Sequence, residues 1–119
     1  MENKRRDLEE RTTSFGIEII LFIKNLKRDI IAIPLISQIV RSSTSIGANY
    51  REATGASSRK DFKNKLYICK KECKETKHWL ELIAETNPEH KDKCRILWKE
   101  AQELTLILSQ AIITLEKKQ

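Results

Sequence analysis

Two pairs of potential metal ligands occur in the sequence, each with a spacing of four residues: Cys69 with Cys73, and His90 with Cys94. Residues four apart share one face of a helix, and thiolate and imidazole are ligands that zinc binds well. If two antiparallel helices meet at a turn over Thr86–Glu89, however, Cys73 lies roughly 20 Å along the axis from His90. The two pairs therefore cannot hold one ion, and we expect the cysteines to be small core residues.

Recognisable catalytic motifs are lacking as well. The sequence has no glycine-rich phosphate loop, no zincin motif and no Gly-x-Ser-x-Gly elbow. His78 precedes Trp79 but has no evident nucleophile or orienting acid near it in the pattern. We therefore expect no enzyme activity, no metal and no cofactor.

A ridge of cations is the strongest functional pattern. Five basic side chains fall within about 60° on a helical wheel and extend over about 27 Å: Arg59, Lys63, Lys70, Lys74 and Lys77. Asp61, Glu72 and Glu75 lie on the opposite side of the same helix. The ridge is a candidate for binding successive phosphates of nucleic acid, with Tyr67 as the nearest ring for stacking. The alternative is a solvated lysine face.

The overall charge agrees with a polyanionic partner. Lys and Arg number 23 against 17 Asp and Glu, which gives a net charge of +6 and a pI near 9.3. The alternative is that the charge serves solubility alone. The charged first residues predict no signal peptide, and the longest apolar run, 17–23, is too short to span a membrane. With three cysteines and no secretory signal, we expect a cytoplasmic protein without disulfides or a membrane partner.

The elements that must position these residues are four amphipathic helices. Gly 3 and Pro 2 leave few turns, while 39% hydrophobic content recurs at helical spacing. The periodicity predicts helices over 6–28, 33–55, 58–85 and 88–117. Their short connections predict one all-α domain, 1–119, folded as a single antiparallel up-down four-helix bundle.

Apolar residues also occur outside the core stripes of these helices. A lone bundle would leave them in water, and clusters of this kind mark interfaces: Ile17, Leu21, Trp79, Leu82, Leu106 and Ile113. We expect a homo-oligomer that assembles through such faces. The alternative is that helix ends or the terminal tail cover some of them.

The centre of the second helix has an unusual composition, with serine, threonine and glycine over 41–50. Such residues favour helices poorly but let a neighbouring helix approach closely. We expect Ser43, Gly47 and Tyr50 to set this packing. Four flanking residues are expected to make polar contacts, either within the bundle or between subunits: Arg41, Asn49, Arg51 and Glu52.

Three segments carry a family resemblance: Arg41-Ser-Ser-Thr-Ser-Ile-Gly-Ala-Asn-Tyr-Arg-Glu-Ala53, Ser58-Arg-Lys-Asp-Phe62 and Lys71-Glu-Cys-Lys-Glu-Thr-Lys-His-Trp-Leu-Glu-Leu82. Over nearly the whole chain, from about Thr12 to Leu115, the sequence resembles the 23S rRNA intervening-sequence proteins. That family includes the accessory variability determinant of diversity-generating retroelements. The resemblance implies a homopentameric barrel of four-helix bundles with a positively charged surface and no catalytic residues.

The resemblance leaves two functions open. In the retroelement members the barrel binds RNA or DNA and a partner reverse transcriptase, which implies a non-catalytic nucleic-acid-binding accessory protein. In the rRNA-insertion branch the alternative is a structural, protein-interaction oligomer with no direct nucleic-acid role.

Overall fold

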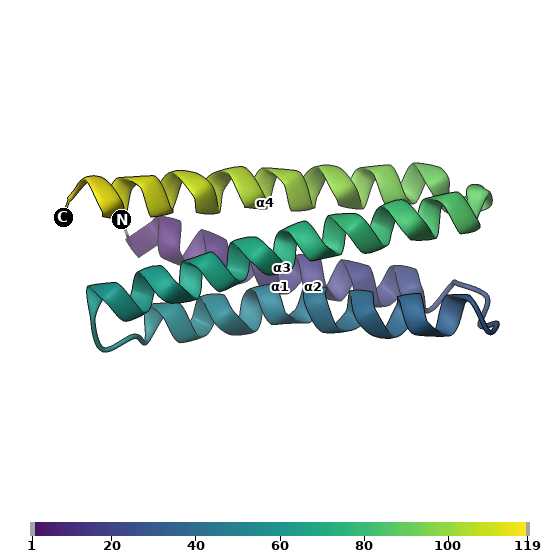
Figure 1. Cartoon of the computed structure of the whole chain (residues 1–119), viewed down its shortest axis with the longest axis horizontal. Coiled ribbons are helices and arrows are strands. Elements are labelled where there is room, and N and C mark those ends of the chain that lie inside the picture. The colour runs from purple at the N-terminus through teal and green to yellow at the C-terminus, as the bar shows by residue number, and fades with distance from the viewer. Residues whose placement is uncertain (1, 119) are drawn as a thin grey trace.

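The computed structural model describes residues 2–118, with side chains described from residue 7 onward, and contains four long helices. These are α1 (Glu2–Ile23), α2 (Ala32–Thr54), α3 (Arg59–Thr86) and α4 (Lys91–Lys117), with a short 3₁₀ helix, η1 (Pro88–His90), before α4. No strand occurs over 2–118. Figure 1 shows the long helices lying side by side, with both chain termini at the same end of a body measuring 48 × 21 × 21 Å.

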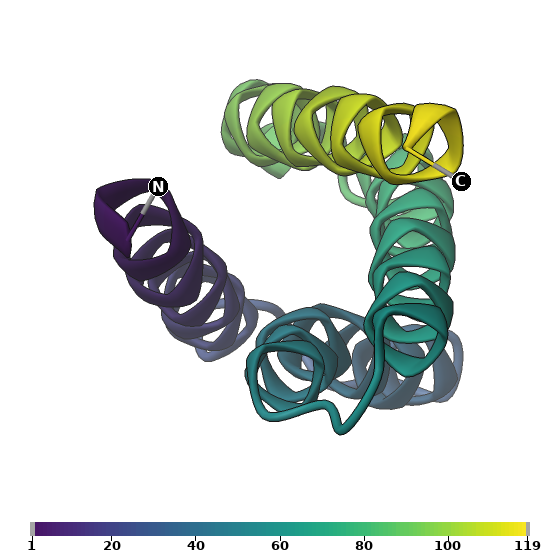
Figure 2. The ribbon, with the colours of Figure 1, turned by 90° about the vertical axis from the view of Figure 1, so that its left-hand side faces the viewer.

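Viewed along the bundle, α1, α2, α3 and α4 follow one another around a shared core (Figure 2). All four contribute fully buried side chains, including Phe15, Ile39, Leu80 and Leu104. Burying each such side chain contributes roughly 1.5–3 kcal/mol. Towards the end that carries both termini, α1 and α4 diverge in Figure 2.

One ionic contact joins α1 and α4 nearer the middle of α4. Arg11 donates from Nε to Glu100 Oε2 at 2.7 Å and from Nη2 to Glu103 Oε2 at 2.9 Å. These hydrogen bonds raise the pKa of the Arg11 guanidinium. Both carboxylates belong to α4. Arg11 therefore ties α1 to α4, two helices that otherwise make few contacts with each other.

The first helix ends earlier than the periodicity predicts, at Ile23 instead of residue 28. Asn25 and Leu26 donate to carbonyls three residues back, which tightens the chain into a turn. Leu26 lies after the end of α1 but is still buried. The apolar spacing therefore continues past the last residue of the α-helix. The Asp29 carboxylate then accepts the amides of residues 31 and 32 and starts α2.

The first helix begins at Glu2, four residues before the predicted start, and α4 ends at the predicted residue 117. The remaining boundaries differ by one to three residues. Ser58 is the N-cap of α3, because its Oγ accepts the Asp61 amide at 3.0 Å. Gly55 follows α2 with φ −99°, so this C-cap does not use the left-handed conformation that favours glycine. The predicted start of the last helix at residue 88 is a 3₁₀ turn, and α4 begins at Lys91.

Candidate nucleic-acid interface

The predicted cation ridge lies along α3 with unequal exposure. Arg59 and Lys74 are exposed, whereas Lys63, Lys70 and Lys77 are half-buried. Neither Arg59, Lys70 nor Lys74 forms a salt bridge within the part of the chain that the structure describes. Their charge is therefore available to an external anion.

The ridge is wider than its sequence pattern suggests, because Lys71 joins it. A shallow surface hollow of about 420 Å³ is lined by Tyr67, Lys70, Lys71, Lys74 and Glu75. Lys71 lies about 60° outside the predicted ridge on the helical wheel, and only the shape of the surface brings it to the same hollow.

Lys77 is the member of the ridge that the fold holds most firmly. Its ammonium donates to Gln102 Oε1 on α4 and lies 5.2 Å from the centre of the Trp98 ring. Such cation–π contacts contribute about 0.5–1 kcal/mol at exposed sites. Lys77 therefore links α3 to α4 in addition to contributing charge.

Tyr67 presents its ring at the surface next to these lysines. The side chain is 43% exposed, and its hydroxyl donates to Glu116 Oε2 of α4 at 2.7 Å. This hydrogen bond to a carboxylate raises the pKa of the Tyr67 phenol. The ring is thus both accessible and anchored.

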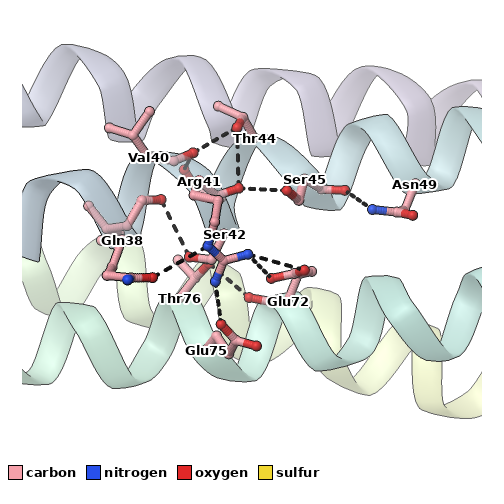
Figure 3. A network of polar contacts seen from close by, with 12 residues as sticks. Gln38, Val40, Arg41, Ser42, Thr44, Ser45, Asn49, Glu72, Glu75 and Thr76 are labelled. Atoms are coloured by element: carbon pink, nitrogen blue, oxygen red, sulfur yellow. Dashed lines mark hydrogen bonds and ion pairs between the residues drawn. The ribbon is translucent and has the colours of Figure 1, made fainter.

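The acidic side of α3 is compensated by Arg41 of α2 (Figure 3). The guanidinium donates to Glu75 Oε1 and, at 3.3 Å, to Glu72 Oε1. Hydrogen bonding to Glu75, followed by the charge of Glu72, raises the pKa of Arg41. Glu72 is buried, so Arg41 neutralises a carboxylate that lies largely out of water. The two faces of α3 consequently differ in net charge.

Beside this ion pair, a buried hydroxyl contact joins α2 to α3. Ser42 Oγ and Thr76 Oγ1 lie 2.8 Å apart, and Thr76 also donates to the Glu72 carbonyl. The neighbouring residues Thr44 and Ser45 donate back to carbonyls four residues earlier, as Figure 3 shows. The polar centre of α2 is therefore satisfied partly by its own backbone.

Ser43, Gly47 and Tyr50, the predicted helix-packing residues, are all buried. A Cβ built on Gly47 would lie 3.4 Å from Thr12 Oγ1 and 3.5 Å from two backbone atoms of α1. The α1 backbone therefore passes within van der Waals distance of this position.

The four flanking polar residues of α2 all make contacts within the chain. Besides the Arg41 cluster, Asn49 donates to the Ser45 carbonyl, Arg51 donates to Thr13 and Glu52 pairs with Lys65 at 2.7 Å. The Glu52 hydrogen bond raises the pKa of Lys65.

The predicted interface residues fall into two groups. Five are exposed, with Leu106 at 58% and Leu21 at 55% among the most open: Ile17, Leu21, Leu82, Leu106 and Ile113. Trp79 differs, because it is half-buried against the core and its indole N–H is buried without a hydrogen-bond partner among the described residues. It therefore packs against the core to an extent that its place on the helical wheel did not predict.

The connection between α1 and α2 is an apolar tip that sequence reasoning missed. Ile30, Ile31 and Ile33 are exposed there, Ile30 to 85%. The sequence pattern that could have revealed this tip is the apolar run Ile30-Ile31-Ala32-Ile33, which lies in the predicted connection between the first two helices.

Comparisons with known proteins identify the family. The family model for 23S rRNA-intervening sequence protein matches residues 6–110. The chain belongs to the 23S rRNA-intervening sequence protein family. A solved structure of a protein of unknown function from the S23 ribosomal protein family of Bacteroides thetaiotaomicron VPI-5482 is 35% identical, with a TM-score of 0.79. The similarity covers 88% of this chain and 97% of that one. A search of curated proteins found no significant match.

The matched range of the 23S rRNA-intervening sequence family contains both the small-residue centre of α2 and all five cations of the ridge. The solved relative is described as having unknown function. Family membership therefore agrees with the four-helix fold and assigns no activity.

The three thiols of this family member are buried and form no disulfide. Burial raises the pKa of Cys69 and Cys73 to about 12 and that of Cys94 to about 11. Over residues 2–118 no group of three or more His, Cys, Asp or Glu side chains is placed to hold a metal ion. The same residues include no helix long and apolar enough to cross a membrane.

Proposed function

We propose that this chain is a non-catalytic nucleic-acid-binding protein that acts as one subunit of a homo-oligomer of antiparallel four-helix bundles. The observation that carries the proposal is the charge separation on α3. Glu72 and Glu75 are paired with Arg41 on one side, while Arg59, Lys70 and Lys74 remain unpaired among the described residues on the other. A face of this kind attracts phosphates.

The geometry of the ridge suits an extended polyanion. Arg59 and Lys77 are 18 residues apart on one helix, which separates them by about 27 Å. Cations spread over this length contact several successive phosphates, and binding of this type does not require a pocket. Affinity then depends on charge and falls as salt rises.

Assembly of several subunits is supported by the exposed apolar residues of α1 and α4. Ile17 and Leu21 lie on α1, and Leu106 and Ile113 on α4. Contacts between copies would remove them from water and repeat the ridge around the assembly. We expect a pentamer from the family resemblance.

The finer assignments follow from the same resemblance. The nucleic acid is RNA, DNA or both, and the protein partner is a reverse transcriptase if the chain serves a diversity-generating retroelement. The three free, buried thiols suit a reducing compartment, so we propose the cytoplasm as its location.

A second candidate function is a structural assembly of the rRNA-insertion branch that binds protein and not nucleic acid. The exposed isoleucines of the α1–α2 tip favour it, because contiguous exposed apolar residues mark protein contacts.

The test is a salt-titrated binding assay on protein of known native mass. Lys63, Lys70 and Lys74 are replaced together by Glu, and the matched control replaces Lys24, Lys27 and Arg28 by Glu. Both variants change the net charge equally. We expect the ridge variant to lose at least tenfold more affinity than the control, with a shallower dependence of log K on log salt.

Equal losses in both variants would show that only total charge matters and would remove the ridge assignment. No measurable binding of wild-type protein to RNA or DNA at low salt, together with a stable oligomer, would favour the structural function. Circular dichroism of all three proteins establishes that each is folded.

A further inference from the structure

Two aromatic rings are anchored across the junction of α3 and α4. The Tyr67 hydroxyl of α3 donates to Glu116 of α4 at 2.7 Å. In the reverse direction, the Trp98 indole N–H of α4 donates to Glu81 Oε2 of α3 at 2.9 Å. Each ring is therefore held in place by a carboxylate of the facing helix. A ligand that stacks on such a ring loses little affinity to the entropy cost of immobilising the side chain.

Cations outnumber carboxylates in the hollow beside each ring. Tyr67 shares its hollow with Lys70, Lys71 and Lys74. A second recess of about 310 Å³ is lined by apolar side chains, by three cations and by the carboxylate that holds Trp98: Leu80, Ala84, Cys94, Trp98, Lys91, Arg95, Lys99 and Glu81. Lys77 lies between the two positions along α3 and contacts the Trp98 ring.

The two sites are separated along α3 by a distance that a few nucleotides can bridge. Tyr67 and Glu81, the partner of Trp98, are 14 residues apart, which corresponds to about 21 Å. Lys70, Lys74 and Lys77 occupy the interval between them. Along the α3–α4 surface, the Tyr67 ring is thus followed by a row of lysines and then by the Trp98 ring.

Rings alternating with cations fit unpaired nucleotides better than a duplex. In a duplex the faces of the bases are stacked on one another, and the protein reaches only phosphates and groove edges. In a single strand every base offers a free face, and stacking on an aromatic side chain contributes about 1–3 kcal/mol per base. A ridge that bound duplex phosphates alone would need neither Tyr67 nor the apolar lining of the recess at Trp98.

We propose that the α3–α4 surface is a binding site for single-stranded nucleic acid, in which one base stacks on Tyr67, a second enters the recess of Trp98 and the intervening phosphates contact Lys70 and Lys74. This proposal rests on the proposed nucleic-acid-binding function and specifies its substrate. An acidic protein segment is the competing occupant of the same surface.

Trp98 provides a direct readout of the site. The chain has two tryptophans, so a Trp79→Phe variant leaves Trp98 as the only one. In this background we expect an oligothymidine strand to quench tryptophan fluorescence on titration. A blunt duplex of the same length should quench weakly and bind at least tenfold less tightly at equal salt.

Tyr67 provides the matched pair of variants. Tyr67→Leu removes the ring, and Tyr67→Phe keeps it while removing the hydrogen bond to Glu116. Loss of one stacked base predicts an affinity of Tyr67→Leu for the single strand that is about five- to 150-fold weaker. Tyr67→Phe should stay within about threefold of the parent, and duplex affinity should be unchanged in both variants.

The outcomes separate this proposal from the function on which it rests. The single-strand site is overturned if the protein binds single strand and duplex equally tightly and Tyr67→Leu does not change the affinity. If replacing Lys63, Lys70 and Lys74 by Glu still weakens binding in that case, the nucleic-acid-binding function stands. No binding to either nucleic acid overturns both. Quenching by an acidic peptide but by neither nucleic acid assigns the surface to a protein partner and also overturns the proposal.

Discussion

Replacing Gly47 with larger residues tests how closely α1 and α2 must approach. A Cβ at this position would meet Thr12 Oγ1 at 3.4 Å and the backbone of Thr12 and Thr13 at 3.5 Å. These are ordinary contact distances, so Gly47→Ala fits. Because alanine favours a helix over glycine by about 1 kcal/mol, we expect an unchanged or slightly raised free energy of unfolding for this variant.

Gly47→Leu should behave in the opposite way. Its additional carbons would have to enter the space of the α1 backbone, which cannot rotate away as a flexible side chain can. Overpacking of this kind costs about 1–3 kcal/mol or more, which corresponds to a fall in Tm of several degrees and a loss of correct assembly.

The matched control is Gly55→Leu, the same chemical change at an exposed position. There a Cβ meets nothing closer than the Arg51 carbonyl oxygen at 3.8 Å, and φ is negative. Urea unfolding followed by circular dichroism, at one protein concentration, gives the stabilities, and native mass gives the oligomer. If Gly47→Leu keeps the parent's Tm and mass, the close approach is not required and the reasoning fails.

Two further predictions concern the buried thiols and the buried ion pair. Between pH 9 and 11 unfolded thiols ionise while the folded ones stay largely protonated, so the free energy of unfolding should fall as pH rises, by up to about 1.4 kcal/mol per pH unit for each thiol. Urea unfolding at pH 9–11 measures this, and a slope in Cys73→Ala equal to that of the parent would contradict it. Arg41→Met strands the buried Glu72 carboxylate and should cost about 1–3 kcal/mol. Glu72→Gln in the same chain should restore part of the loss, and strict additivity in this double-mutant cycle would show that the pair is uncoupled.

Much of the fold was predictable because it depends on local periodicity. Apolar residues such as Phe15 and Ile19 recur every three or four positions, and that spacing predicts both the helix and its buried face. The end of the first helix was not predictable in this way. Leu26 keeps the apolar spacing while the backbone has already left the α-helix, so periodicity alone cannot locate the boundary.

The sequence also determined which side of α3 is basic, because the position of a side chain around a helix follows from its number. It could not determine which of these charges are already satisfied. That depends on what the neighbouring helices place opposite: Arg41 beside Glu72, Gln102 and Trp98 beside Lys77. Partners more than 20 positions apart meet only through helix packing, which has no signature in local spacing.

The cation ridge and the four amphipathic helices were therefore properties of the sequence itself. The tertiary structure decided that Trp79 is half-buried against the core, that Lys71 joins the hollow at Tyr67 and that the tip between α1 and α2 exposes its isoleucines. The physical reason is the same in each case. Exposure and pairing depend on the side chains that other helices bring within a few ångströms, and these are fixed only when the helices pack.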